Sequence, residues 1–323
     1  MNDRGKGVTE GLAAVVVSFN SRGELGPCLD ALLAQRPPVR VIVVDNASSD
    51  GSAELVRERF GGRVTLVEPG CNTGFAGGCN RGLAAATGCS VVAFLNPDVI
   101  VGPGCLAAAA ACLERHPRAG AVAPLLLRPD GETVDSAGQC LARWTLEVRD
   151  RGYGRPLADE LRREVPVLAA CGALAVFRRE ALDRAALDGA WAEPFFCFWE
   201  DLELGWRLNN AGWEVWLCPE AVAAHGRGAG AAAGSGPLRW RRPVELEACI
   251  LSNRWMTLAR HLHGLDLAVR APVLLAWDLV MTGAGILRRP RLLAALARRL
   301  PLVAREWRRR RSLPRRRLKE LPC

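Results

Sequence analysis

An aromatic run that ends in two carboxylates is the segment best suited to chemistry. The stretch FFCFWEDLELGWRL brings Glu200 and Asp201 to the start of a predicted helix over residues 201–210. Apolar neighbours raise the pKa of a carboxylic acid, whereas the positive end of a helix lowers it. A carboxylate under these opposing effects suits a general base. The alternative, that both residues are ordinary N-terminal helix charges, remains open.

A further carboxylate follows a buried apolar run. FLNPDV places Asp98 just beyond residues 91–95, where it can reach a divalent cation that bridges phosphate groups. Mg²⁺ or Mn²⁺ is the expected ion. As a plain turn the tripeptide 96–98 would be unremarkable, because Asn-Pro is a common loop signal.

The glycine-rich stretch NTGFAGGCNRGL (72–83) permits close approach of the backbone to a bound nucleotide. Asn72, Gly74 and Asn80 are its candidate donor contacts. Its spacing is not that of the G-x-G-x-x-G dinucleotide fingerprint, so the NAD interpretation loses support. A helix-entry turn with glycines for packing is the alternative.

The elements that would position these residues belong to an α/β fold. β-branched runs alternate with helical segments through the first third, which predicts a mostly parallel central sheet flanked by helices. Ligands of such sheets bind beyond the carboxyl ends of the strands. The predicted strands cover residues 13–19, 39–44, 64–67 and 91–95, and the polar residues at their ends are Ser18, Asn20, Asp45, Asn46, Asn72, Asn96 and Asp98.

The second half is less regular. Residues 125–139 predict a hairpin, 165–177 a buried strand interrupted at Gly172, and 214–217 a short strand. Residues 226–236 are typical of a flexible loop, and helices follow to the end. The expected organisation is an N-terminal tail (1–11), a catalytic domain (12–236) with a nucleotide half (12–124) and an acceptor half (125–236), and a basic helical extension (237–323).

Four segments in this order resemble the family 2 glycosyltransferases with the GT-A fold, particularly their rhamnosyltransferase-like members. The resemblance covers about residues 12–260. It implies an inverting, metal-dependent enzyme that moves a sugar from a nucleotide-diphosphate donor to a hydroxyl. The segments are VVVSFN (15–20), VVDNASSDGS (43–52), NTGFAGGCNRGL (72–83) with FLNPDV (94–99), and the stretch 195–230.

The resemblance also implies roles for single residues. Asp201 would take the proton of the acceptor hydroxyl, Asp45 would hold the nucleotide's base or ribose, and His225 would lie near the metal and the diphosphate. On the acceptor side it implies Gly172, with Trp199 and Glu200. Many relatives carry Asp-x-Asp where this chain has Asn96-Pro97-Asp98, so only one acid is available for the metal there.

The rhamnosyl resemblance makes dTDP-L-rhamnose the first-choice donor. The expected acceptor is a glycan or a polyprenyl-diphosphate-linked glycan in cell-surface polysaccharide synthesis. A nucleotidyltransferase and a non-catalytic nucleotide-sugar-binding protein are the alternatives. Neither has a use for an acceptor base in an aromatic Glu-Asp segment.

Net charge and cysteines indicate the compartment. The formal charge is +9, but fourteen Lys and Arg against two Glu lie between residues 288 and 323, so the body is nearly neutral. The basic region has one aromatic residue, Trp307, and no recognition module, so nucleic acid is not an expected partner. Twelve cysteines without a C-x-x-C pair, after a polar start, predict a reducing cytoplasm.

The C-terminal region predicts an association with a membrane surface rather than a span. The apolar stretch 271–287 is shorter than a spanning helix and contains Asp278, so no transmembrane segment is expected. Arginines flank an apolar stripe at helical spacing, which is typical of a helix lying on the anionic inner face of a cell membrane. A helix that packs on the catalytic domain is the alternative. The stripe consists of Leu292, Leu293, Leu296, Leu300, Leu302 and Val303.

Overall fold

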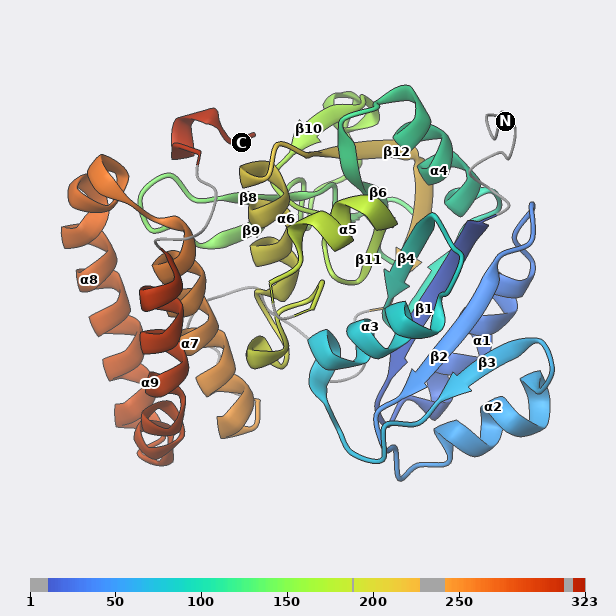
Figure 1. Ribbon diagram of the computed structural model, residues 1–323, viewed down its shortest axis with the longest axis horizontal. Coiled ribbons are helices and arrows are strands. Elements are labelled where there is room, and N and C mark those ends of the chain that lie inside the picture. The colour runs from blue at the N-terminus through green and yellow to red at the C-terminus, as the bar shows by residue number, and fades with distance from the viewer. Residues whose placement is uncertain (1–10, 188, 227–241, 311–315, 323) are drawn as a thin grey trace.

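The computed structural model describes residues 11–187, 189–226, 242–310 and 316–322 and has a central sheet between two layers of helices (Figure 1). The strand order is β10-β12-β6-β11-β4-β1-β2-β3, with β5 paired to β12 and β7 paired to β6, and β8 and β9 form a separate hairpin. The strands are β1 (Leu12–Ser18), β2 (Arg40–Asp45), β3 (Val64–Val67), β4 (Val91–Leu95), β5 (Val99–Val101), β6 (Ala119–Leu127), β7 (Val134–Ser136), β8 (Gln139–Leu141), β9 (Val148–Asp150), β10 (Val165–Val167), β11 (Leu174–Arg178) and β12 (Glu214–His225).

Helices cover both faces of the sheet because its strands are apolar on both sides. One apolar cluster joins the sheet to α3, α5 and α6, and a second joins it to α1, α2 and α4. Along β1, Ala13 and Val15 enter the first cluster, and Ala14 and Val16 the second. The helices are α1 (Arg22–Leu33), α2 (Ser52–Phe60), α3 (Gly74–Ala85), α4 (Cys105–Arg115), α5 (Arg179–Ala185), α6 (Glu200–Asn210), α7 (Val244–His261), α8 (Gly264–Arg288) and α9 (Arg291–Arg309).

The four strands predicted in the first third are confirmed, and they pair in parallel as β3-β2-β1-β4. The second half makes the sheet mixed, because β11 runs antiparallel to both β4 and β6. The hairpin predicted over 125–139 is also confirmed, since β6 pairs antiparallel with β7. The sheet is therefore parallel in its first part and mixed in its second.

The prediction of one strand over 165–177 is wrong. Residues 165–167 form β10, which pairs with β12, whereas β11 lies between β4 and β6. Gly172 lies in the connection, where the chain leaves one part of the sheet for another. Because both segments are apolar, hydropathy alone could not separate them.

Two further predictions need comment. The strand expected over 214–217 is longer, since β12 continues to His225. The loop expected over 226–236 lies outside the described residues apart from Gly226, as does the N-terminal tail apart from Gly11. The proposed domain boundaries remain predictions.

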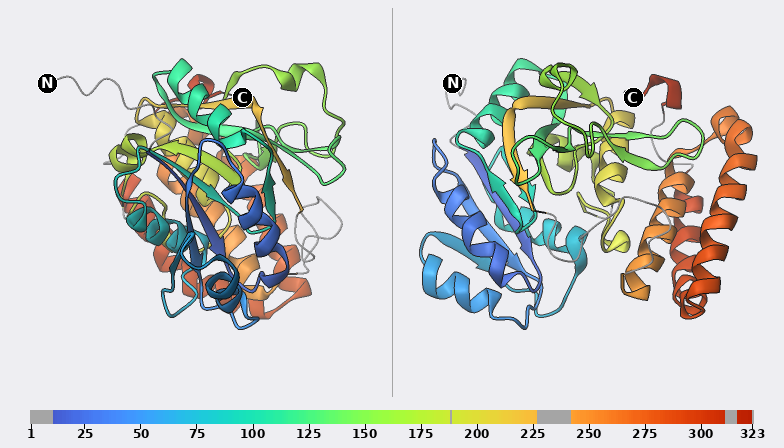
Figure 2. Two further views of the ribbon diagram at one scale, coloured as in Figure 1. Left: turned by 90° about the vertical axis from the view of Figure 1, so that its right-hand side faces the viewer. Right: turned by 180° about the vertical axis from the view of Figure 1, so that it is seen from behind.

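Helices α7, α8 and α9 lie side by side at one end of the molecule, with α8 outermost (Figures 1 and 2). The expectation that the apolar stretch was too short to span a membrane is wrong in its length. α8 has 25 residues and is, among the described helices, the one long and apolar enough to span by length and composition. The apolar stretch starts after Arg270, whereas the helix begins at Gly264 and includes Asp266 and Arg270.

The predicted apolar stripe of α9 is used mainly for packing. Leu292 and Leu296 are buried in a cluster with residues of α7 and α8, and Leu302 and Val303 pack against the cluster around Phe195. Leu293 and Leu300 remain exposed. The alternative of packing on the catalytic domain therefore describes Leu302 and Val303, whereas Leu292 and Leu296 pack on the neighbouring helices α7 and α8.

Candidate active site

The carboxyl ends of β1 and β2 carry buried polar side chains. Asp45 is buried, and its Oδ2 accepts a hydrogen bond from the backbone N–H of Ser48 at 2.9 Å. Among the described residues, Oδ1 of Asp45 and Oγ of Ser18 have no hydrogen-bond partner although both are buried. Buried polar atoms are usually paired, so these two indicate a place for polar groups of a ligand.

Asn46 and Asn72 bind the backbone at the start of α3. Nδ2 of Asn46 donates to the carbonyl of Gly74 at 3.0 Å, and Oδ1 of Asn72 accepts from the N–H of Gly74 at 2.9 Å. Gly74 has φ +71°, and a Cβ there would lie 2.3 Å from the carbonyl oxygen of Phe196. The glycine-rich loop therefore packs directly against the aromatic run that leads to Asp201.

Asn20 and Asn80 have different surroundings. Asn20 is exposed with φ +50°, and its Oδ1 accepts from the N–H of Ser49 at 2.8 Å, so it connects the loop after β1 to the loop after β2. Asn80 bonds the backbone N–H and carbonyl of Trp191, each at 2.9 Å. Because both the nitrogen and the oxygen of this amide are bonded to the backbone of Trp191, Asn80 connects α3 to the segment around Trp191 and is not proposed as a donor contact.

Asp98 and His225 are brought together by strand pairing. β5 runs antiparallel to β12, with His225 opposite Val99, and Oδ1 of Asp98 lies 3.4 Å from Nε2 of His225. Nδ1 of His225 lies 2.7 Å from Oδ2 of the fully buried Asp135. A histidine that binds a metal through one ring nitrogen commonly donates the hydrogen of the other to a carboxylate, which orients the ring. Here Asp135 is that carboxylate, and Nε2 faces Asp98. Asp98 and His225 therefore fit a divalent cation.

The pKa of His225 reflects these carboxylates. Burial lowers it, but the hydrogen bonds with Asp135 and Asp98 outweigh burial and raise it to about 9. A bound cation would replace the proton on Nε2, since metal binding requires a neutral imidazole. Asn96 lies at the same edge, and its backbone N–H donates to the carbonyl of Ala173 at 3.0 Å.

Asp201 is the carboxylate with the most organised surroundings. Its Oδ2 accepts hydrogen bonds from the N–H of Gly172 at 2.8 Å and from Nε2 of Gln139 at 2.9 Å, and Oδ1 accepts from the N–H of Leu202. Burial raises the pKa of Asp201, and these hydrogen bonds oppose the rise without cancelling it. A Cβ at Gly172 would lie 3.3 Å from Oδ2, so the glycine permits the close approach.

Glu200 lacks the hydrogen bonds that stabilise the ionised form of Asp201. It is buried, and burial followed by the charge of Asp201 raises its pKa well above the usual value. Its Oε2 has no hydrogen-bond partner among the described residues. Burial therefore favours the protonated form of Glu200 more strongly than that of Asp201, whose hydrogen bonds stabilise the ionised form, so Asp201 is the better proton acceptor of the pair.

The aromatic loop before Asp201 has an unusual backbone. Phe196, Phe198 and Trp199 have φ values of 64°, 69° and 72°, in the left-handed region that L-residues rarely adopt. Such conformations persist when the surroundings hold them and are frequent at functional sites.

Asn253 of α7 holds this loop. Its Nδ2 lies within hydrogen-bond distance of three loop carbonyl oxygens, at 2.8, 2.9 and 2.7 Å. Arg299 of α9 donates to Oδ1 of Asn253 at 2.7 Å and to the carbonyl of Pro194 at 3.0 Å. The three carbonyls belong to Phe195, Cys197 and Phe198.

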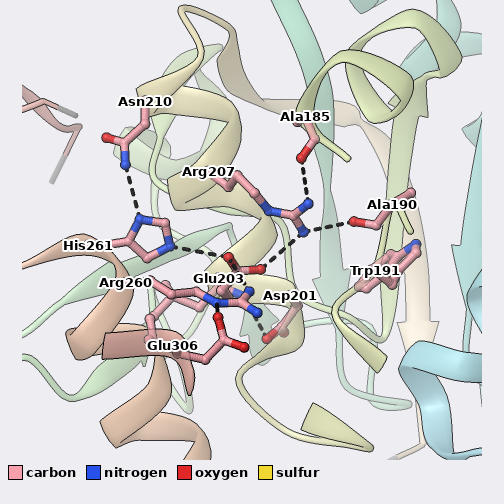
Figure 3. Close-up of polar contacts among 12 residues, drawn as sticks. Ala185, Ala190, Trp191, Asp201, Glu203, Arg207, Asn210, Arg260, His261 and Glu306 are labelled. Carbon is pink, nitrogen blue, oxygen red and sulfur yellow. Dashed lines mark hydrogen bonds and ion pairs between the residues drawn. The ribbon is translucent and has the colours of Figure 1, made fainter. Parts of the chain in front are cut away.

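A buried ion cluster fixes α6 itself to the C-terminal helices, as Figure 3 shows. Glu203 lies 2.8 Å from Arg260 and 3.1 Å from Arg207, and His261 lies 3.3 Å away. Arg260 also contacts Glu306 of α9 at 2.7 Å. Burial alone would raise the pKa of Glu203, but Arg207 and Arg260 hold it well below its usual range.

Sequence reasoning missed Asp135, Gln139, Asn253 and Arg299. Of these four, only Asp135 could have been found from the sequence. It stands in the second strand of the expected hairpin, and a carboxylate buried there needs a partner. The other three act through contacts between residues more than 40 positions apart, which no local pattern encodes.

The fold and the site together define a glycosyltransferase with the GT-A fold. The chain belongs to glycosyl transferase family 2, whose family model matches residues 13–185. This membership confirms the expected enzyme class and excludes the alternative of a nucleotidyltransferase.

The chain resembles proteins named N-acetylglucosaminyl-diphospho-decaprenol L-rhamnosyltransferase from two strains of Mycobacterium tuberculosis. The identity is 31% over 241 residues, which are 68% of this chain and 76% of the relative.

Two solved structures share the fold. A structure of GalNAc-T7 with UDP, GalNAc and Mn²⁺ has a TM-score of 0.59 at 15% identity, over 77% of this chain and 48% of that one. The mannosyltransferase PcManGT from Pyrobaculum calidifontis, in complex with GDP-Man and Mn²⁺, has a TM-score of 0.51 at 21% identity, over 91% and 75%.

Proposed function

We propose that this glycosyltransferase moves L-rhamnose from dTDP-L-rhamnose to a hydroxyl of a glycan carried on polyprenyl diphosphate, in the synthesis of a cell-surface polysaccharide. The relative's named activity supports the sugar and the acceptor class. The observation that carries the reaction type is the single carboxylate Asp201, oriented by Gly172 and Gln139 beside Glu200, whose pKa is raised well above its usual value.

The reaction is a single displacement. The acceptor oxygen attacks the anomeric carbon of the donor, the bond from that carbon to the diphosphate oxygen breaks, and the acceptor's proton passes to Asp201. The nucleoside diphosphate leaves with the electron pair of the broken bond. One displacement without an enzyme nucleophile inverts the anomeric configuration.

Two groups of residues would hold the substrates. The donor contacts are those near the ends of β1, β2 and β4, and the acceptor side surrounds the base. The proposed donor contacts are Ser18, Asn20, Asp45, Asn46, Asn72, Gly74 and Asn96, and the proposed acceptor-side residues are Gly172, Trp199 and Glu200.

Asp98 and His225 would hold a divalent cation, Mg²⁺ or Mn²⁺, with Asp135 orienting the imidazole. When bound, such an ion neutralises charge on the donor diphosphate. The Mn²⁺ in both fold relatives supports this assignment.

We also propose that the enzyme works in the cytoplasm at the inner face of the membrane. The lipid-linked acceptor in the relative's name and the basic C-terminal region support this location. An anionic surface attracts such a region.

The test is incubation of the purified protein with a panel of nucleotide sugars, Mg²⁺ or Mn²⁺, and a short-chain N-acetylglucosaminyl-diphospho-lipid. We expect turnover of dTDP-L-rhamnose above that of dTDP-glucose and UDP-N-acetylglucosamine, with metal required. NMR of the product should show the inverted anomer. A retained configuration would mean that Asp201 is not a base in a single displacement.

A further inference from the structure

The outward face of α8 is apolar along its whole length. Leu265, Leu275, Leu279 and Leu287 have exposed fractions of 76%, 64%, 74% and 86%, and at 100° per residue they fall on one side of the helix. The buried residues of α8 lie on the opposite side, which faces α7 and α9. Apolar surface of this extent on a soluble protein usually marks a contact site.

Three charged residues of α8, Asp266, Arg270 and Asp278, form ion pairs within the protein, and the fourth, Arg288, is exposed at the end of the helix. Asp278 lies 2.7 Å from Arg254 of α7, and Asp266 lies 3.0 Å from Arg270. A spanning position would break the first pair and place these charges in hydrocarbon, which is costly. The arrangement favours a helix that lies in a membrane surface with its outer side in the lipid.

The tip of the β8–β9 hairpin provides a second membrane signal. Trp144 is about half exposed there, and its ring lies under two guanidinium groups, with Arg143 at 5.7 Å and Arg270 at 5.9 Å from the centroid. Exposed tryptophan beside arginine is typical of the membrane–water interface.

A cavity of about 870 Å³ lies between this hairpin, the start of α8 and residues 316–322. Part of its wall is apolar, with Leu141, Leu146 and Leu168 among the lining residues. Its cations outnumber its carboxylates by five to one. The cations are Arg143, Arg270, Arg316, Arg317 and Lys319, and the carboxylate is Asp266.

The one carboxylate among the described lining residues, Asp266, is already bonded within the protein. Asp266 pairs with Arg270 and accepts a hydrogen bond from the N–H of Leu318 at 3.0 Å. Arg316, Arg317 and Lys319 form no ion pair within the described part of the chain. The cavity therefore offers unneutralised positive charge beside an apolar wall.

This cavity is separate from the catalytic carboxylate. The N–H of Arg316 at its edge donates to Oδ1 of Asn210, the last residue of α6, whereas Asp201 lies in the first turn. Nine residue steps along a helix correspond to about 14 Å. The donor and the acceptor hydroxyl therefore react elsewhere.

We propose that the cavity binds the phosphate of an anionic bilayer phospholipid, whose acyl chains lie along its leucines while the outer face of α8 rests in the membrane surface. The inference rests on the proposed membrane location and not on the transfer reaction. Charge complementarity selects this occupant, because a second copy of the chain across α8 would bring two sets of cations together.

The test is flotation of the full-length protein with phosphatidylglycerol-containing vesicles and with pure phosphatidylcholine vesicles. We expect binding to the first only. Arg316→Gln, Arg317→Gln and Lys319→Gln together should weaken it by about 100-fold, at roughly fivefold per basic residue. The charge-matched control combines Arg118→Gln, Arg162→Gln and Arg184→Gln, which are exposed elsewhere, and should bind normally.

A second variant tests the apolar face. Leu279→Glu should abolish vesicle binding, whereas Leu187→Glu, on an exposed leucine of the catalytic domain, should not. Thermal melting checks that each variant is folded. Dimerisation of the wild type that Leu279→Glu removes would instead assign the face to a second copy and overturn the proposal.

Two further outcomes would overturn it. The cavity is not a lipid site if the triple glutamine variant keeps wild-type vesicle affinity, or if inorganic phosphate binds the cavity while vesicles do not. Donor turnover with a soluble acceptor and no vesicles is measured in parallel. Loss of that turnover with vesicle binding intact would contradict the proposed reaction and leave the lipid site standing.

Discussion

Arg299 on α9 donates a hydrogen bond to the side-chain carbonyl of Asn253 on α7, at 2.7 Å. This bond orients the amide so that its nitrogen faces the carbonyls of the aromatic loop before Asp201. Helices α7 and α9 therefore hold the loop that leads to Asp201.

Asn253→Ala should lower kcat by about 100-fold and leave nucleotide affinity nearly unchanged, because a displaced catalytic group costs about that much in rate. The loop would lose the amide that holds its positive-φ residues. Steady-state kinetics and calorimetry with the nucleotide check this. Thr257→Val removes another buried polar group of α7 and controls for general destabilisation. Equal losses in both variants would contradict a specific positioning role.

Asp201→Asn should lower turnover by about 100-fold or more, the usual scale for loss of a general base, and preserve donor binding. The matched change Glu200→Gln should have a much smaller effect, because burial and the charge of Asp201 favour the protonated form of Glu200. Single-turnover measurements compare the two. Near-normal turnover in the Asp201 variant would remove this residue from the role.

The pH profile of kcat should reveal Asp201. Its pKa is raised by burial, so the rate should rise with pH through a value above that of an ordinary aspartate as the carboxylate ionises. Gln139→Leu removes a hydrogen bond that stabilises the ionised form, which should move the rising limb to higher pH. A limb that moves to lower pH, or stays in place, would mean that another group titrates.

Asp98→Ala should abolish the metal-dependent part of donor binding. Asp135→Asn should weaken metal affinity by about 10- to 100-fold, the usual effect of losing a residue that orients a ligand. Titration of the protein with Mn²⁺ and dTDP, followed by calorimetry, separates the two changes. Asp159→Asn, on a fully exposed side chain, is the surface control. Unchanged Mn²⁺-dependent affinity in the Asp98 variant would place the metal elsewhere.

Glu306→Gln should destabilise the fold by about 3–5 kcal/mol, because it leaves the buried Arg260 short of one charge partner. Deletion of residues 288–323 should then prevent folding, so a stable catalytic part without the tail is not expected. Chemical denaturation measures the first effect. A truncated protein with the wild-type free energy of unfolding would contradict the packing of α9.

Glu203 also sets a pH dependence of stability. Its pKa is well below the unfolded value of about 4.3, so its contribution is present above that value and is lost as pH falls towards its folded pKa.

Much of the nucleotide half could be predicted because its information is local. A buried parallel strand is a short apolar run, and the residues proposed to bind ligands stand at its end or within a few positions, as Asp45 and Asp98 do. Asp201 could also be found, since its aromatic run and helix are adjacent in sequence.

The remainder depends on contacts that a linear pattern does not contain. The division of residues 165–177 into two strands depends on which neighbours each half meets in the sheet. The sequence predicts the apolar stripe of α9 but not the surface that it contacts. A stripe that faces a membrane and one that faces α7 have the same composition. The amides of Asn80 and Asn253 look alike in sequence and differ only in what surrounds them.

The left-handed residues of the aromatic loop have a consequence for biosynthesis. A ribosome completes the nucleotide half and the loop before it makes Asn253 and Arg299, which hold the loop in that conformation. The loop can therefore settle into this conformation only after α7 and α9 have been synthesised, so Asp201 reaches its final position late in the making of the chain.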